Sequence, residues 1–430
     1  MVLLQPRNSL VSVVLLLVVV IIGHVDSVKQ ILSFGGNGMI GSEVLARLIK
    51  EGDYNITLVS RGSWHFDAGV RVMPYVNAIV CDRNRDAPCA GLTDCDINTI
   101  HYCEDLWKTI NDTEHFDAVL DFSGYEPKWI HDAIFALEKK VGVYVYISSD
   151  SVYDVCQPKS SDRQSVETDA VRPHNIQKRK SLIEGDRYGD AKLSGEEALK
   201  NQREEDDGGF PWVALRFSDV VGPRDTTYRW QIYQLWIKLY HDIGIPIFVP
   251  PSIKNVKESL TYVDDAAQAV ILAMNKPDAW DNAYNIAFDK EFYLWDILQM
   301  MAKALGVEGI EQDNEESERS VHLFPTVFSG PQDITKAKEK LGFVPSDPEK
   351  AFQDTVAWYD EAFINMERER EEMITRFMVH VLPRESKDAF YLAVGKELEK
   401  HGIILEKYRK KRKGDLGEFG MDEDTAHQEL

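Results

Sequence analysis

Residues 29–41 read Lys-Gln-Ile-Leu-Ser-Phe-Gly-Gly-Asn-Gly-Met-Ile-Gly, and this stretch decides the fold. Its apolar first half predicts a short strand, and the glycines at Gly35, Gly38 and Gly41 predict a tight turn. Apolar residues then recur at helical spacing, and residues 56–59 form the next apolar run. The stretch therefore predicts a strand–helix–strand unit, a connection that joins parallel strands.

The glycine spacing also carries a chemical expectation. Glycine allows a tight turn, close approach of the backbone to a pyrophosphate, and close packing of the helix on the strand. The start of the following helix offers N–H groups and the positive end of a dipole. We therefore expect a dinucleotide pyrophosphate to bind at this turn, through Gly35, Gly38, Met39, Ile40 and Gly41.

Further apolar runs alternate with helical patterns along the chain. The strand-like runs cover residues 78–81, 118–122, 143–147 and 212–217. This alternation predicts an α/β fold, a doubly wound parallel sheet of the Rossmann type with helices on both faces. Helical patterns over residues 230–241, 266–274, 294–305, 333–341 and 352–363 predict a smaller C-terminal α/β lobe that binds the substrate. Two segments, 90–112 and 156–186, read as insertions.

The expected organisation has four parts. Residues 1–27 form a leader, and residues 28–225 form most of the dinucleotide-binding domain. Residues 226–365 form most of a substrate lobe that is interleaved with it. Residues 366–430 form a charged, helical, peripheral extension.

Charge and cysteine spacing exclude two classes of function. The 430 residues carry a net charge of −22, which disfavours sequence-independent nucleic-acid binding. The clustered cysteines Cys81, Cys89, Cys95 and Cys103 lack the short paired spacing of a zinc site, so we expect no metal. In an oxidising compartment this cluster supplies one or two disulfides of open connectivity, and Cys156 is left over.

Both ends of the chain resemble targeting signals. Arg7 precedes the apolar run 10–22, whose length favours a cleaved signal peptide over an uncleaved anchor, the only case that implies a membrane. The terminal His427–Leu430 resembles the Lys-Asp-Glu-Leu retrieval signal. We expect the lumen of the endoplasmic reticulum, with secretion or membrane anchoring there as alternatives. Of the glycosylation sequons at Asn55 and Asn111, the second is the better candidate.

Five further motifs, in this order, resemble the extended branch of the short-chain dehydrogenase/reductase superfamily. That branch includes the NAD-dependent epimerases and dehydratases of nucleotide sugars. The resemblance covers roughly residues 29–362. Within the branch, the chain is most similar to the divergent, atypical members. The motifs are Ile147–Tyr153, Tyr188–Lys192, Leu215–Arg224, Tyr262–Ala267 and Leu341–Pro345.

The resemblance implies a catalytic group of Ser149, Tyr188 and Lys192. A tyrosine hydroxyl has an ordinary pKa near 10, too high for a base at neutral pH. Lys192 lies four residues on, on the same helix face, where its charge favours the phenolate. Tyr188 would then exchange a proton with a substrate hydroxyl or carbonyl, and Ser149 would bond the same oxygen. Tyr188 and Lys192 would also contact the cofactor, and Asp82 would lie near its adenine.

Three departures from the family pattern limit what the resemblance implies. Asp150 is kept, but Ser151 stands where sugar dehydratases carry a glutamate base, which argues against dehydration. Lys257-Glu258 stands where many epimerases carry an arginine that grips the nucleotide diphosphate. Residues 121–124 replace the usual apolar-alanine pattern after the fourth strand.

The second strand ends in Ser60-Arg61-Gly62, without the acid that holds the ribose hydroxyls of NAD. Arg61 instead suits a 2′-phosphate, so we expect NADP, with NAD as the alternative.

The predicted function is an NAD(P)-dependent oxidoreductase or epimerase acting on a hydroxyl or carbonyl carbon of a small molecule, possibly a nucleotide sugar. The alternative is a non-catalytic NAD(P)-binding scaffold, against which the retained Tyr188 and Lys192 argue. The family also implies a homodimer, built on helices that start near Leu182 and Ile130.

Overall fold

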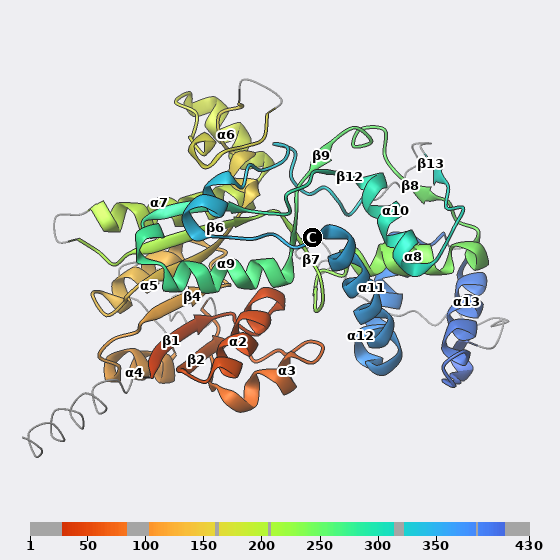
Figure 1. The fold of residues 1–430 in the computed structure, drawn as a ribbon, viewed down its shortest axis with the longest axis horizontal. Helices are drawn as coiled ribbons and strands as arrows, with labels where there is room; N and C mark the ends of the chain where they lie inside the picture. Colours follow the sequence, from red (N-terminus) through yellow and green to blue (C-terminus); the bar gives the residue numbers. More distant parts are fainter. Residues whose placement is uncertain are drawn as a thin grey trace, which may run out of the picture.

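The computed structural model describes residues 28–83, 103–159, 163–204, 208–313, 322–383 and 386–408. A seven-stranded parallel sheet forms one side of the molecule, and a mainly helical lobe forms the other (Figure 1). The sheet order is β11-β6-β5-β4-β1-β2-β3. Its strands are β1 Lys29–Phe34, β2 Tyr54–Ser60, β3 Asn77–Val80, β4 Ala118–Asp121, β5 Tyr144–Ser149, β6 Trp212–Phe217 and β11 Asn282–Ile286.

Helices cover both faces of this sheet, as predicted for a doubly wound fold. On one face α2 (Met39–Glu51) and α9 (Val263–Asn275) share an apolar cluster with the strands. On the other face the cluster is formed with α4 (Glu104–Asp112), α5 (Pro127–Leu137) and α7 (Arg187–Glu204). The central strands β4, β5 and β6 are buried along their whole length because helices cover both of their faces. The predicted Rossmann architecture is confirmed.

One expected insertion is part of the frame. Within residues 90–112, the part from Glu104 forms α4, whose Leu106 and Ile110 are fully buried. This helix is the crossover between β3 and β4, so reading it as an insertion was wrong. The helix was not recognised in the sequence because only two of its residues, Leu106 and Ile110, are apolar and buried, and most of the others are polar. In the other expected insertion, 156–186, α6 (Ile176–Gly185) extends away from the sheet, whereas η3 (Glu167–Asp169) lies against it, since Glu167 accepts the Asn285 N–H of β11 at 2.9 Å.

The second lobe has a core of its own. Its helices α8 (Arg229–Ile243), α10 (Leu294–Leu305) and α11 (Pro348–Asn365) share one apolar cluster. Three two-stranded pairs edge the lobe: β7 (Asp219–Val221) with β10 (Leu260–Tyr262), β8 (Ile247–Phe248) with β13 (Gln312–Asp313), and β9 (Lys257–Glu258) with β12 (Phe292–Tyr293). A helix is expected over residues 333–341, and the structure has a shorter π-helical turn there, η5 (Ala337–Leu341).

The described part of the C-terminal extension is helical, but it is not peripheral, because it packs into the core of the second lobe. It contains α12 (Glu367–His380) and α13 (Lys387–Glu399), and apolar side chains of both helices join the core cluster of α8. The remaining short helices are α3 Ala68–Arg71, η1 Met73–Tyr75, η2 Asp150–Tyr153, η4 Pro277–Ala279 and η7 Glu406–Tyr408. No helix within the described ranges is long and apolar enough to cross a membrane.

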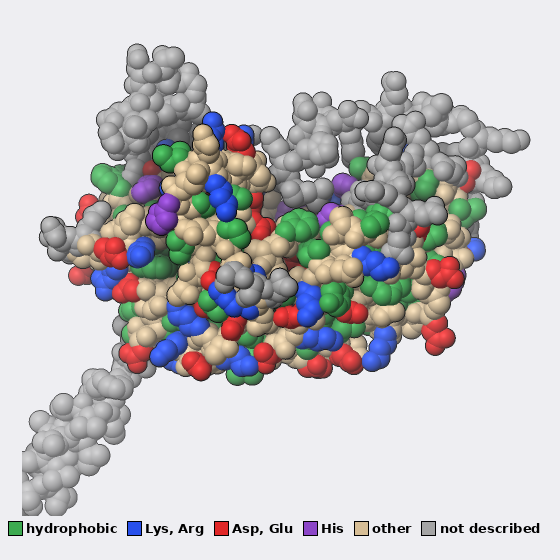
Figure 2. Space-filling view, turned by 90° about the horizontal axis from the view of Figure 1, so that it is seen from above, with side chains coloured by type: hydrophobic (Ala, Val, Ile, Leu, Met, Phe, Trp, Pro, Cys, Tyr) green, Lys and Arg blue, Asp and Glu red, His purple; other side chains and the backbone are tan. Residues whose placement is uncertain are grey.

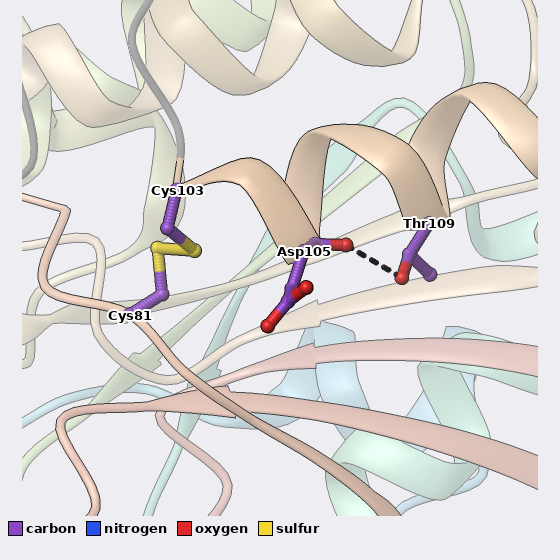
Figure 3. Close-up of a disulfide and its surroundings, with 4 residues drawn as sticks. All are labelled: Cys81, Cys103, Asp105 and Thr109. Atoms are coloured by element: carbon purple, nitrogen blue, oxygen red, sulfur yellow. Dashed lines mark hydrogen bonds between the residues drawn. A yellow bond between two sulfur atoms is a disulfide. The ribbon is translucent and has the colours of Figure 1, made fainter.

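One disulfide joins Cys81, directly after β3, to Cys103, directly before α4 (Figure 3). In the first turns of α4 the Thr109 hydroxyl donates to the carbonyl of Asp105 at 2.8 Å. Cys156 is buried and free, as expected of the leftover cysteine. The other two clustered cysteines, the leader 1–27 and the terminal tetrapeptide lie outside the described residues.

Both sequon asparagines are exposed, Asn55 on β2 and Asn111 in the last turn of α4. The Asn55 amide donates to the Gln30 side chain at 2.7 Å. Figure 2 shows basic and acidic side chains interspersed over one face of the molecule, without a continuous surface of one sign.

Candidate active site

The turn between β1 and α2 depends on glycine at three positions. Gly35 has φ of +73°, and a Cβ there would lie 2.6 Å from the Cβ of Ser123. A Cβ on Gly36 would lie 2.4 Å from the Ser33 hydroxyl. A Cβ on Gly41 would lie 2.5 Å from the Cα of Gly36. The turn therefore packs directly on the next strand end and on its own helix, as the glycine spacing predicts.

Gly38 plays a different part. It precedes α2 in an extended conformation, no side chain caps the helix, and a Cβ there would meet only the Gly35 carbonyl, at 3.7 Å. The N–H groups of Met39, Ile40 and Gly41 have no acceptor within the helix. A glycine with open space beside it, at the start of a thirteen-residue helix, fits the pyrophosphate of a dinucleotide.

The segment after β2 lies beside this turn. The Asn37 amide donates to the Ser63 carbonyl, which ties the two together. Arg61 is exposed at the end of β2, a place from which a 2′-phosphate can be met. The far end of the segment is held by an ion pair between Arg224 and Asp67 and by Glu369 of α12, which accepts the Phe66 N–H at 3.0 Å.

The residues directly after β3 include Asp82, which was predicted, and Arg83, whose ion pair with Asp121 was not. Asp82 is half-buried there, as the adenine prediction requires. Its neighbour Arg83 bonds both carboxylate oxygens of Asp121, at 3.0 and 3.1 Å, and lies 4.3 Å from the centre of the Phe34 ring. Asp121 also accepts from the Tyr144 hydroxyl at 2.6 Å. This network joins β1, β3, β4 and β5, and it accounts for the departure at residues 121–124.

The ammonium of Lys192 is buried beside Tyr188. Lys192 is 1% exposed and donates to the carbonyls of Gly124, at 3.1 Å, and Ile147, at 2.9 Å. Its Nζ lies 5.5 Å from the centre of the Tyr188 ring and 4.7 Å from that of Tyr125. Burial lowers the pKa of Lys192 to about 8. The ammonium thus lies beside the Tyr188 ring, and with this pKa it loses its proton slightly above neutral pH.

Tyr188 is the exposed member of the group, at 45%. Partial burial, with smaller contributions from Tyr125 and Asp150, raises its pKa above the ordinary value, and a hydrogen bond with Ser149 opposes the rise. The water at its exposed side screens these charges. The structure therefore brings Ser149, Tyr188 and Lys192 together, and adds Tyr125, whose ring lies 6.4 Å from that of Tyr188.

Two other departures from the family pattern concern Ser151 and Lys257-Glu258. Ser151 is buried, and its hydroxyl lies 3.3 Å from that of Ser149, so a hydroxyl occupies the place of the dehydratase base. Lys257 is exposed and pairs with Glu291 at 2.7 Å, whereas Glu258 is 4% exposed. Among the described residues no group of histidine, cysteine, aspartate and glutamate side chains is arranged to hold a metal ion.

Comparisons with known proteins agree with this geometry. No curated protein matches the chain significantly. The UDP-glucose 4-epimerase of Thermotoga maritima is 20% identical, with 78% of this chain and 100% of that chain covered and a TM-score of 0.55. The UDP-N-acetylglucosamine 4-epimerase of Methanobrevibacter ruminantium is 19% identical, with 78% and 99% covered and a TM-score of 0.54. The dTDP-glucose 4,6-dehydratase of Bacillus anthracis, solved with NAD, is 15% identical, with 78% and 97% covered and a TM-score of 0.56.

These solved structures share the fold seen here. The sequence profile of the NAD dependent epimerase/dehydratase family matches residues 31–287, more than half of the chain. The matched segment runs from the glycine turn through Tyr188 and Lys192 to the last strand of the sheet. The chain therefore belongs to the NAD-dependent epimerase/dehydratase family.

Proposed function

We propose that this chain is an NAD(P)-dependent oxidoreductase or epimerase that acts at a hydroxyl-bearing carbon of a sugar, with Tyr188 as the acid–base. The observation that carries the proposal is the buried Lys192 ammonium, 5.5 Å from the Tyr188 ring and bonded to the Ile147 carbonyl near the carboxyl end of β5, the edge of the sheet at which the glycine turn also lies. A non-catalytic scaffold has no use for a charge buried at this cost.

The side chains divide the work as follows. The Lys192 charge stabilises the phenolate form of Tyr188, whose Oη takes the proton of the substrate hydroxyl and becomes the neutral phenol. The Ser149 hydroxyl bonds the same substrate oxygen and orients it. When bound, the nicotinamide supplies the hydride acceptor. Tyr125 covers the Lys192 ammonium and keeps water from it.

The choice of cofactor is argued from the residues after β2, and the choice of substrate from the similar solved structures. The absence of an acid after β2, together with the exposed Arg61, supports NADP, whereas solved relatives such as the dehydratase bind NAD. Nucleotide sugars are the substrates named for similar structures, which supports a sugar here.

The test combines binding with product analysis. Calorimetric titration with NAD and NADP measures cofactor affinity, and a panel of sugars and nucleotide sugars is screened for cofactor reduction and for epimers. We expect binding of at least one cofactor, and turnover that Tyr188→Phe abolishes. A protein that binds neither cofactor contradicts the proposal and favours the scaffold.

We further propose that the chain forms a homodimer through α5 and α7, which start at Pro127 and Arg187 rather than near Ile130 and Leu182. The 62% exposed Phe135 on α5 supports an interface there. Sedimentation should show a dimer at micromolar concentration, and Phe135→Asp should weaken it. A wild-type monomer contradicts this assembly.

We also propose residence in the lumen of the endoplasmic reticulum. The leader, the terminal tetrapeptide and the Cys81–Cys103 disulfide support it. The intact chain should be retained, and a chain lacking residues 427–430 should be secreted. Retention of the truncated chain in carbonate-washed membranes indicates an anchor instead, and cytosolic staining of the intact chain contradicts the proposal.

A further inference from the structure

Glu258 is a buried carboxylate without a hydrogen-bond partner. It lies in β9, is 4% exposed, and neither Oε1 nor Oε2 has a partner within the described part of the chain. Its strand neighbour Lys257 faces outward and pairs with Glu291. Burying a polar group without a partner is costly, so such a group is retained where a ligand supplies the partner.

The charges of three other side chains act on Glu258, each from a different element, and Leu260, two residues after Glu258, pairs with Asp219. Asp219 comes from β7, Arg229 from α8 and Asp150 from η2, and the charges of all three act on the pKa of Glu258. Burial is the largest effect and raises that pKa well above its usual range. The group therefore contains three carboxyls and one guanidinium.

Arg229, the guanidinium of this group, already forms an ion pair with Asp219. Arg229 donates to Asp219 and lies 5.0 Å from the centre of the Phe324 ring. Asp219 accepts in addition from the N–H and the hydroxyl of Thr326, at 3.0 and 2.7 Å. Arg229 is therefore bonded to Asp219 rather than to Glu258, and it is not available to a phosphate without breaking a buried ion pair.

This group adjoins the acid–base. The charges of Asp150 and Arg229 both act on the Tyr188 hydroxyl, and Asp150 is bonded to Ser149 at 3.2 Å. A substrate oxygen held by Ser149 and Tyr188 therefore lies beside Asp150, whose charge acts on Glu258 as well.

Two classes of ligand do not fit the group. The carboxyls are not arranged to hold a metal ion among the described residues. A diphosphate beside Glu258 and Asp150 would meet like charges, or would force both carboxyls to stay protonated. A group that donates hydrogen bonds satisfies Glu258 in either protonation state.

We propose that Glu258 determines substrate specificity by accepting a hydrogen bond from a hydroxyl or amino group of the substrate and by excluding a diphosphate. This inference rests on the proposed function and narrows its substrate to a sugar that carries no nucleotide diphosphate at this place. Glu258 acts by binding and takes no part in proton transfer.

Binding to the cofactor-loaded protein tests the exclusion without turnover. Uridine 5′-diphosphate and uridine differ only by the diphosphate, and both are titrated by calorimetry into wild type, Glu258→Arg and Glu258→Gln. Glu291→Gln, at the exposed partner of Lys257, is the matched control. We expect Glu258→Arg to gain at least about tenfold in affinity for the diphosphate and nothing for uridine.

Measurements of turnover test which substrate group donates the hydrogen bond to Glu258. D-glucose and D-glucosamine distinguish a hydroxyl from an amino group, and oxidation by wild type is compared with that by Glu258→Gln. We expect KM for the preferred sugar to rise at least about tenfold while the cofactor affinity stays the same. Thermal denaturation of each variant separates misfolding from loss of binding.

Tight diphosphate binding by wild type, or a diphosphate affinity that Glu258→Arg leaves unchanged or lowers, overturns the inference. A folded Glu258→Gln with unchanged KM overturns it as well. A protein that binds no cofactor at all overturns the proposed function instead, so the two failures are distinguishable.

Discussion

The cofactor half and the substrate half of the site differ in how their polar groups are satisfied. Around the glycine turn the contacts are made by backbone, and close packing leaves no room for side chains at Gly36 and Gly41. Around Glu258 the surfaces are side chains from four separate elements, and one carboxylate is left unpaired. The first half is defined by shape and the second by charge. Shape constraints leave a spacing in the sequence, and charge clusters do not.

Substitutions at the glycines of the turn test the difference between the two halves of the site with the largest expected effect. Gly41→Ala places a Cβ 2.5 Å from the Gly36 Cα, so we expect a loss of stability of about 1–3 kcal/mol and no detectable cofactor binding. Gly38→Ala should keep the stability and lose only the cofactor. Thermal denaturation with and without NADP measures both. Gly185→Ala, with nothing within 4 Å of its Cβ, is the control. Equal stability of the first two variants would contradict the packing argument.

Removing the phenol separates chemistry from binding. Tyr188→Phe should lose about 10²–10⁴-fold in turnover, the usual contribution of general acid–base catalysis, with cofactor affinity retained. Tyr75→Phe, at a 63% exposed tyrosine in η1, should have no effect. Single-turnover cofactor reduction is the measurement. Unchanged turnover in Tyr188→Phe removes this residue from the mechanism.

The buried ammonium predicts a dependence on pH. With a pKa of about 8, Lys192 loses its charge above that pH, and turnover should fall about tenfold per unit. Stability should change in the opposite direction. Between pH 8 and the unfolded value near 10.5, the unfolded chain binds the proton and the folded one does not, so stability of the cofactor-free protein rises with pH. Lys192→Met should abolish this rise. Activity that stays level to pH 10 would contradict the buried charge.

The smallest effect concerns the phosphate of the cofactor. Arg61 is exposed, and exposed charge pairs contribute about 0.2–1 kcal/mol, so Arg61→Ala should lower the preference for NADP by about fivefold at most. Lys50→Ala removes an exposed cation at the end of α2 and serves as the control. Calorimetry at two salt concentrations is the measurement. An unaltered ratio of NADP to NAD affinity would eliminate Arg61 as the determinant.

The sequence predicted what depends on local pattern. The glycine turn and the buried strands follow from local pattern, whereas Ser149, Tyr188 and Lys192 were expected from the resemblance that the family motifs carry. The Arg83–Asp121 pair was missed because its members lie 38 residues apart, one in the turn after β3 and the other at the end of β4. The inward direction of Glu258 depends on which face of β9 is covered, and that is decided by α8 and the segment after residue 321. α4 was misread because its apolar stripe has only two residues.

The bonds between α12 and the segment after β2 have a consequence for synthesis of the chain. Glu369 accepts from Phe66 and Arg368 donates to the Trp64 carbonyl, across 303 and 304 residues of sequence. The ribosome makes the segment beside the glycine turn early, but its last anchors emerge only when α12 does. A nascent chain that already contains the whole sheet therefore still lacks these anchors, and the segment is completed by contacts of very high sequence separation, which form late in folding.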